Sequence, residues 1–319
     1  MSIQWTFMPS DHFDGKHFFT PGAPQPKSFS NVLRWMLTRD RATWHVERDA
    51  PTSLPPARVS GNQLFVTFVN HSTVLIQTAG LNILTDPIWS ERASPFSFVG
   101  PKRFSRPGIG FDNLPPIHIV LLSHNHYDHM DLPTLRAIQK NHAPRVYAPL
   151  GNGRYLVPAG MKRAVELDWW QADKYSDQLT VHCTPSQHFS GRSLADRNRA
   201  LWCSWVLQAP AGNIYFAGDT GFGSHFRDVK TRFESFRLAL LPIGAYEPRW
   251  FMSPVHMDPD EAVQAHEILA PLMSIGIHHG TFQLTDEAQN EPRERTERLA
   301  AEKKLNFRIL RNGESLQLA

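Results

Sequence analysis

A buried strand that leads directly into a cluster of metal-binding side chains most restricts how this chain can fold. Residues 117–122 form a nearly unbroken apolar run, as in a strand covered on both faces of its sheet. An HxHxDH motif follows at once and places four ligand-type side chains within six residues: His124, His126, Asp128 and His129. Imidazole combined with carboxylate suits Zn²⁺ and similar ions. The alternative is a run of histidines on the solvated surface. We would expect such a run within a polar loop, whereas this one directly follows an apolar strand.

Short β-rich runs dominate the chain from residue 63 onward, with helical patterns between some of them. Helical periodicity is found at residues 132–142, 258–269 and 287–304, and Asp258 followed by Pro259 is a typical helix start. Strict βαβ alternation is absent, so the pattern predicts a layered α/β protein with mixed sheets. We expect strands at residues 64–69, 73–78, 83–85, 117–122, 179–184, 203–207, 214–217, 238–242, 273–277 and 307–310.

The first 61 residues differ from the rest of the chain. They are rich in Pro, Phe, Trp and His, and repeated prolines interrupt any long helix. Only residues 29–38 have the spacing of a short amphipathic helix. We expect this N-terminal extension to pack on the main domain, and a lid or membrane-facing element beside the site is the alternative.

Charge and composition exclude several classes of protein. The formal net charge of +3, from 33 Lys and Arg against 30 Asp and Glu, is too small to predict a nucleic-acid partner. Cys183 and Cys203 form no CxxC pair, and we expect buried, reduced thiols in a cytoplasmic protein. The N-terminus lacks the pattern of a signal peptide, and no stretch of about 18 apolar residues predicts a membrane-spanning helix.

Three further candidate ligands, His188, Asp219 and His278, each follow a predicted strand. A single histidine in such a place is more often structural than a ligand. The recurrence at strand ends, where α/β folds gather their sites, favours a metal centre. Asp86 also follows a strand, in Thr-Asp-Pro, and we expect it to orient a metal-bound histidine.

An HxHxDH motif followed by isolated His, Asp and His resembles the metallo-β-lactamase superfamily. Its fold is an αββα sandwich with the metals at one edge of the two sheets. The resemblance implies a metallo-β-lactamase-fold hydrolase domain of residues 62–319, which follows the N-terminal extension of residues 1–61. Longer segments resemble the phospholipase D family that hydrolyses N-acyl phosphatidylethanolamine, and they lie at residues 84–88, 92–95, 100–104, 166–170, 184–188 and 242–252.

That resemblance implies two Zn²⁺ ions per chain, bridged by Asp219. One ion would be held by His124, His126 and His188. The other would be held by Asp128, His129 and His278. His279 competes with His278. We prefer His278 because the family motif places the ligand immediately before an aromatic or polar residue, which Gly-Thr then follows.

The implied reaction is phosphodiester hydrolysis of the phospholipase D type. A hydroxide bridging the two ions, oriented by Asp128, would attack phosphorus in line. His256 matches an active-site histidine of the family, and we expect it to donate a hydrogen bond to phosphate or a proton to the leaving alkoxide. The alternative is that His256 caps the helix or faces solvent. An aromatic run is expected to line a groove for acyl chains, with core packing as the alternative: Tyr246, Arg249, Trp250 and Phe251.

Other functions remain open at this stage. The same metal site would also serve a lactone or another small ester or amide, and a small, closed, polar pocket would favour such a substrate. A metal-stabilised binding module is the non-enzymatic alternative, which a missing ligand would favour. A phospholipid or another small molecule is the expected substrate, and a peripheral membrane contact and a homodimer are both left open.

Overall fold

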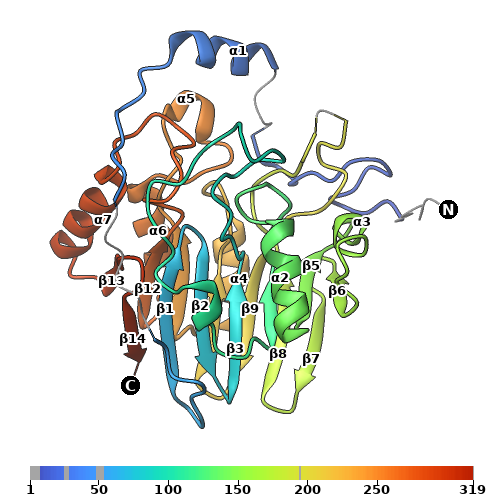
Figure 1. Ribbon diagram of the computed structural model, residues 1–319. Helices are drawn as coiled ribbons and strands as arrows, with labels where there is room; N and C mark the ends of the chain where they lie inside the picture. Colours follow the sequence, from blue (N-terminus) through green and yellow to red (C-terminus); the bar gives the residue numbers. More distant parts are fainter. Residues whose placement is uncertain (1–7, 25–28, 48–53, 194, 319) are drawn as a thin grey trace.

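Two seven-stranded sheets lie face to face in the centre of the protein (Figure 1). The computed structural model describes residues 8–24, 29–47, 54–193 and 195–318. The strands of the first sheet are, in spatial order, β14 (Ser315–Leu318), β1 (Leu64–Asn70), β2 (Thr73–Thr78), β3 (Leu81–Thr85), β4 (Ile119–Leu121), β5 (Arg145–Pro149) and β6 (Ala164–Leu167). Those of the second are β13 (Phe307–Arg308), β12 (Met273–Ile277), β11 (Leu238–Pro242), β10 (Gly212–Phe216), β9 (Ser204–Ala209), β8 (Leu179–Thr184) and β7 (Ala172–Ser176).

The inner faces of both sheets share one hydrophobic core. Ile76 and Ile119 of the first sheet pack in the same cluster as Trp205 and Ile214 of the second. Helices bury the outer faces as well, so strands such as β2 are buried along their whole length. This double coverage explains why the strand runs are continuously apolar and do not alternate.

Helices cover both outer faces and complete an αββα sandwich, which confirms the expected fold class. α2 (Leu132–His142) packs on the first sheet through Leu135 and Ile138. The second sheet is covered by α4 (His225–Phe233), α6 (Pro259–Leu269) and α7 (Glu291–Glu302). Short helical segments occur in the connections, namely α3 (Gly153–Leu156), α5 (Arg249–Met252) and the 3-10 turn η1 (Phe111–Asn113).

Local sequence signals predict the start of α6 correctly and the start of α7 too early. At α6 the Asp258 carboxylate accepts the Glu261 N–H at 2.9 Å while the Glu261 side chain accepts the Asp258 N–H, a complete capping box. α7 begins four residues later than its periodicity predicts. Glu287 does not enter that helix because its carboxylate accepts hydrogen bonds from the Ala245 N–H and the Thr285 hydroxyl.

Strand direction places many connections at one edge of the sandwich. β3, β4 and β5 are parallel to one another, and so are β10, β11 and β12. β1 runs in the same direction as β3 in the first sheet, and β8 runs in the same direction as β10 in the second. The segments that follow these strands therefore emerge at the same, upper edge in Figure 1. Among the described residues, no helix is long and apolar enough to cross a bilayer.

The N-terminal segment contributes to the main core. Phe13 and Phe18 are buried in the central cluster, with ring centroids 4.4 Å apart. His12 stacks on Trp169 and forms a 2.8 Å contact with the Asp168 carboxylate. α1 (Phe29–Thr38) lies above α5 at the top of the molecule (Figure 1). Both cysteines, Cys183 and Cys203, are free and buried, as expected.

Replacing Phe18 by alanine should lower the free energy of unfolding by about 3–5 kcal/mol, because it leaves a cavity among fully buried side chains. Denaturant unfolding followed by tryptophan fluorescence measures this change. Met8, which is 85% exposed on the same segment, offers the control Met8→Ala, with an expected change within about 0.5 kcal/mol. Equal stability of the two variants would show that the segment is not part of the core.

Candidate metal centre

Three histidines meet where β4 and β8 end. His124 and His126 lie on the segment after β4, and His188 lies four residues beyond β8. His126 Nδ1 is 2.8 Å from His124 Nε2 and 3.3 Å from His188 Nε2. Nitrogen ligands about 2.0–2.1 Å from a tetrahedral ion lie about 3.3 Å from one another. The three nitrogens therefore have the spacing of ligands around one ion.

A second group of ligand-type atoms lies beside the first and contains two carboxylates. His129 Nε2 is 3.2 Å from Asp128 Oδ2 and 3.1 Å from Asp219 Oδ2. His278 Nε2 is 3.4 Å from the same Asp128 oxygen and 3.1 Å from the same Asp219 oxygen. The two groups are contiguous, because Asp219 Oδ2 also lies 3.9 Å from the Nε2 atoms of both His124 and His188.

Asp219 enters the centre through a tight approach of two loops. It follows β10 directly after Gly218, which has a φ of +60°. A Cβ atom at Gly218 would lie 2.4 Å from the Cβ of Ser123, the residue just before the HxHxDH motif. Only glycine tolerates both the left-handed backbone and this contact. The Gly-Asp pair thus lets the Asp219 carboxylate reach ligands that come from the other sheet.

The charges of the two groups differ. Burial and the neighbouring His188 lower the pKa of His126 to about 3, so this imidazole is neutral, the form that binds metal. At His278, burial alone would lower the pKa, but the carboxylates of Asp219 and Asp128 outweigh it and raise the pKa to about 9. The local field around Asp128 and Asp219 therefore favours positive charge, which a bound cation would supply.

Several ligand-type atoms contact other candidate ligands without forming a hydrogen bond. His129 Nε2, His278 Nε2 and Asp219 Oδ1 are buried, and none has a hydrogen-bond partner among the described residues. Unpaired buried polar atoms are costly, so a protein retains them where something else satisfies them. A cation shared by these atoms would do so, and the seven residues fit a centre of one or two metal ions.

Neighbouring groups hold the imidazoles in orientation. The His129 Nδ1–H donates to Asp86 Oδ2 at 2.6 Å, and Asp86 also accepts the backbone N–H of Ser123 at 2.7 Å. The His188 Nδ1–H donates to the Val255 carbonyl at 2.9 Å. Each of these bonds fixes the ring so that its Nε2 faces the centre, the usual arrangement around metal-binding histidines.

His71 belongs to the centre, although the sequence pattern did not lead us to it. Its Nε2–H donates to Asp128 Oδ2 at 2.9 Å, and its ring lies 4.1 Å from that of His278. Its carbonyl accepts the His278 N–H at 2.8 Å. His71 immediately follows β1, so the rule that polar residues after strand ends gather at the site could have identified it.

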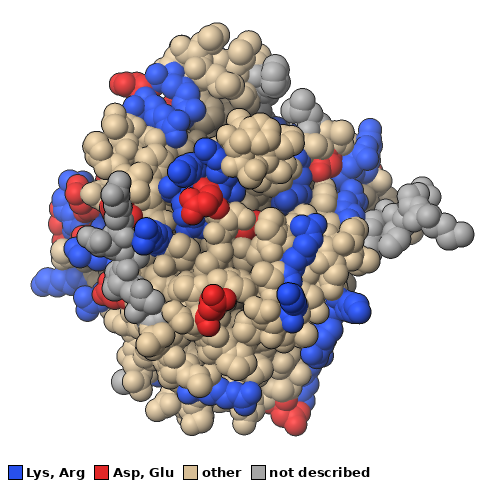
Figure 2. Space-filling model, viewed as in Figure 1, with Lys and Arg blue, Asp and Glu red and all other residues tan. Residues whose placement is uncertain are grey.

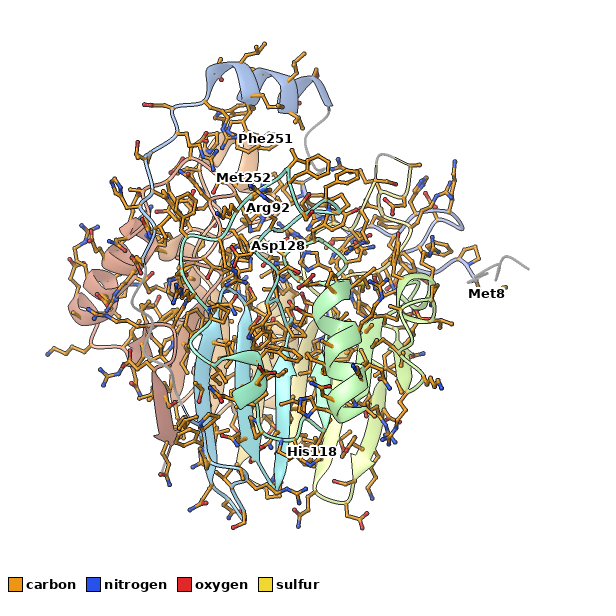
Figure 3. The ribbon with its side chains drawn as sticks, in the orientation of Figure 1. Met8, Arg92, His118, Asp128, Phe251 and Met252 are labelled. Carbon is orange, nitrogen blue, oxygen red and sulfur yellow. The ribbon has the colours of Figure 1, made fainter. Side chains whose placement is uncertain are left out.

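An apolar cavity of about 250 Å³ opens onto the centre. Asp128, labelled in Figure 3, lies at the upper ends of the strands, with Phe251 and Met252 between it and α1. His256 also lines the cavity. It is buried, its Nδ1 has no partner among the described residues, and its ring lies 5.1 Å from that of His188. Val32 and Trp35 of α1 form the outer wall.

Of the four residues predicted to bind substrate, only Phe251 lines the cavity, and the other three lie outside its lining. Phe251 lines the cavity and stacks on Trp35 at 5.1 Å. Trp250 is partly exposed outside it. Tyr246 is fully buried and its hydroxyl donates to Glu291 at 2.8 Å, outside the cavity lining. Arg249 is also outside the lining: it donates to the Glu261 carboxylate at 2.7 Å and to the His256 carbonyl at 2.9 Å.

The structure distinguishes the two adjacent histidines after β12. His278 has a φ of +61°, and its ring points to Asp128 and Asp219. The ring of His279 instead stacks on Phe68 at 5.1 Å, almost parallel to it, away from the other six candidates. All seven residues that we selected from the sequence therefore lie together at one edge of the sandwich.

Asp86→Asn should weaken metal binding about 10- to 100-fold, because an amide is a poorer acceptor for the His129 Nδ1–H than a carboxylate. Competition with a chromogenic chelator measures the dissociation constant. Asp173→Asn makes the same change outside the centre, where the carboxylate pairs with Arg145 and Tyr147, and should leave metal affinity unaltered. Unchanged affinity in Asp86→Asn would contradict the positioning role.

Comparisons with known proteins agree with this geometry. A family model described as a β-lactamase superfamily domain matches residues 81–279. An N-acyl-phosphatidylethanolamine-hydrolyzing phospholipase D of Caenorhabditis elegans is 38% identical over 252 residues, which cover 75% of this chain and 70% of that protein. The mitochondrial enzyme of the same description from Saccharomyces cerevisiae is 36% identical over 260 residues, 80% of this chain and 55% of that protein.

A solved structure supports the fold independently. Igni18, a metallo hydrolase from the archaeon Ignicoccus hospitalis, matches 81% of this chain and 99% of its own, with a TM-score of 0.62 and 19% sequence identity. That identity establishes a common fold only. With the family match and the two phospholipase-named relatives, we conclude that the chain belongs to the metallo-β-lactamase superfamily of metal-dependent hydrolases and resembles its N-acyl-phosphatidylethanolamine-hydrolysing members.

Proposed function

We propose that the protein is a dinuclear-zinc phosphodiesterase that hydrolyses N-acyl phosphatidylethanolamine-like phospholipids. The observation that carries this proposal is the pairing of two contiguous ligand groups with an apolar cavity. The names of the worm and yeast relatives favour the same substrate class. The products would be a phosphatidic-acid-like monoester and an N-acylethanolamine.

Zinc fits the donor set. Nitrogen and carboxylate oxygen ligands without thiolates suit Zn²⁺ in a catalytic site, where three protein ligands leave a position open. We assign one ion to His124, His126 and His188. The other is assigned to Asp128, His129 and His278, with Asp219 between the two. When bound, such a pair activates water at neutral pH and neutralises charge on phosphoryl oxygens.

The chain's own residues would orient the reacting groups. Asp128 has one oxygen fixed by the His71 Nε2–H, so its carboxylate is held in one position facing the cavity. Burial keeps the pKa of His256 well below its ordinary value, and a neutral imidazole carries one N–H. We assign that N–H to a hydrogen bond with a phosphoryl oxygen, because His256 lines the cavity beside His188.

The cavity suits part of a lipid better than a small polar ring. About 250 Å³ lies slightly below the usual range for ligand sites and would accommodate a phosphodiester with its nearest carbons. Acyl chains would have to leave it past α1 and α5. Apolar side chains form most of the wall, including Val32, Phe251 and Leu284, and a lactone substrate would make less use of them.

A membrane surface is the partner that fits the outer face of α1. Val32 and Trp35 face the cavity, whereas Leu37, on the opposite side of the helix, is 78% exposed, and Met36, at the border of the cavity face, is 62% exposed. The Arg34 guanidinium lies 5.2 Å above the partly exposed Trp250 ring, an aromatic and cationic pair typical of lipid interfaces. In Figure 2, basic side chains with an acidic group beside them border the uncharged top of the molecule, and the basic groups suit anionic headgroups.

Asp219→Asn should abolish turnover, because it removes the carboxylate shared by both ligand groups. The assay follows ethanolamide release from N-acyl phosphatidylethanolamine, in parallel with an acyl lactone and a β-lactam. Asp112→Asn, an exposed aspartate in η1, is the matched control and should retain full activity. Full activity of Asp219→Asn would contradict the mechanism, and wild-type turnover of the lactone alone would contradict the substrate class.

Met36→Gln combined with Leu37→Gln should weaken binding to vesicles that contain phosphatidylglycerol about tenfold, because two apolar side chains no longer enter the lipid. Vesicle sedimentation measures the partition. Leu272→Gln is the control, since Leu272 is 70% exposed just before β12, at the end of that strand opposite to His278. A similar loss in both proteins would exclude α1 as the lipid-binding element.

A further inference from the structure

We propose that Arg197 binds the anionic phosphodiester of the substrate and selects charged substrates over neutral ones of similar shape. This inference rests on the proposed function, since it specifies the substrate of the same site. Arg197 is the one Arg or Lys among the described residues that line the cavity. None of the sequence patterns discussed above includes it.

The side chain is held by an aromatic ring next to the metal centre. The Arg197 guanidinium lies 4.8 Å above the ring of Phe189. Phe189 in turn contacts the ring of His126 edge-on, with centroids 4.5 Å apart. Stacking uses the face of the guanidinium and leaves the N–H groups at its edge free to bind an anion. The cation is thereby placed one ring away from a candidate metal ligand.

Hydrogen bonds of the residues on both sides of Arg197 support this placement. Ser190 and Asn198 lie side by side, because the Asn198 N–H donates to the Ser190 carbonyl at 2.9 Å and the Asn198 side chain accepts the Ser190 N–H at 3.2 Å. The Asp196 carboxylate accepts the backbone N–H groups of Arg192 and Ser193 at 2.9 and 2.7 Å. The two residues that flank Arg197, Asp196 and Asn198, are thus both anchored. Little conformational freedom of this backbone is therefore lost when a ligand binds.

Neighbouring arginines are already engaged, whereas Arg197 is not. Arg192 donates to the carbonyls of Asn125 and Met130 and stacks on Tyr127. Arg39, just beyond the end of α1, pairs with Asp286. Within the described part of the chain, the Arg197 guanidinium forms no hydrogen bond or ion pair and contacts only the Phe189 ring, and the residue is exposed at the edge of the cavity.

A phosphodiester matches this cation chemically. It carries a full negative charge at neutral pH, and its two non-bridging oxygens fit the planar N–H fork of arginine. A lactone or neutral ester offers no such charge. The metal-ligand set alone does not distinguish these electrophiles, so a fixed cation in an otherwise apolar wall would provide the discrimination.

Arg197→Gln tests the assignment, with Arg199→Gln as the matched control. Arg199 is exposed on the chain just beyond the same loop and is not among the residues that line the cavity. Calorimetry on zinc-loaded protein compares octyl phosphate with octanol, which has the same chain without the charge. Arg197→Gln should weaken octyl phosphate binding about 10- to 100-fold, and octanol binding should not change. Arg197→Lys should restore only part of the affinity, since it keeps the charge without the fork.

Kinetics separate this inference from the proposed function. With N-acyl phosphatidylethanolamine, Arg197→Gln should raise KM more than it lowers kcat. If wild-type protein does not hydrolyse this lipid, the proposed function fails, yet the octyl phosphate comparison still tests Arg197. Equal octyl phosphate affinity in Arg197→Gln and Arg199→Gln, with equal metal content, would overturn the inference.

Discussion

Two buried carboxylates, Asp128 and Asp219, impose the constraint on which the rest of the site depends. Isolated charges are expensive to bury, so a protein keeps them only where positive charge compensates. Here burial alone would raise the pKa of both groups, but the surrounding histidines hold each pKa well below its ordinary value. The ends of four strands, β1, β4, β8 and β12, deliver the compensating histidines, and the two sheets must align for these ends to meet. The requirement for charge balance thus links a local cluster to the global topology.

Much of this arrangement was predictable because the signals are local or periodic. The HxHxDH motif follows a buried strand, and His188, Asp219 and His278 each follow another. The rule that parallel strands share an edge then brings distant residues together without knowledge of the packing. The limits of α1 and α2 were predictable as well, because helical periodicity and, for α2, the Asp131-Leu132-Pro133 start mark them.

Other parts depend on tertiary contacts that a sequence pattern does not contain. β7 is a polar edge strand, Ala172–Ser176, and forms only by pairing with β8. β14 depends likewise on β1, some 250 positions earlier in the chain. The sequence gives no partner for the Arg249 cation within its aromatic run, but in the structure Arg249 donates a hydrogen bond to Glu261 of α6. Glu287 fits a helical pattern in the sequence, but it lies outside the helix because its carboxylate accepts hydrogen bonds from the backbone N–H groups of Ala245 and Glu247.

The metal-ligand candidates and the residues of the cavity wall lie on different parts of the fold, and this difference separates their roles. Metal-ligand candidates sit at strand ends, where two covered sheets hold them rigidly, so this part of the chemistry can stay constant across a superfamily. The cavity wall comes instead from α1, from α5 and from the loop that carries Arg197. Such connections vary without disturbing the core, because few of their contacts are buried between the sheets. Substrate choice in this protein should therefore be governed by the wall and not by the metal-ligand set.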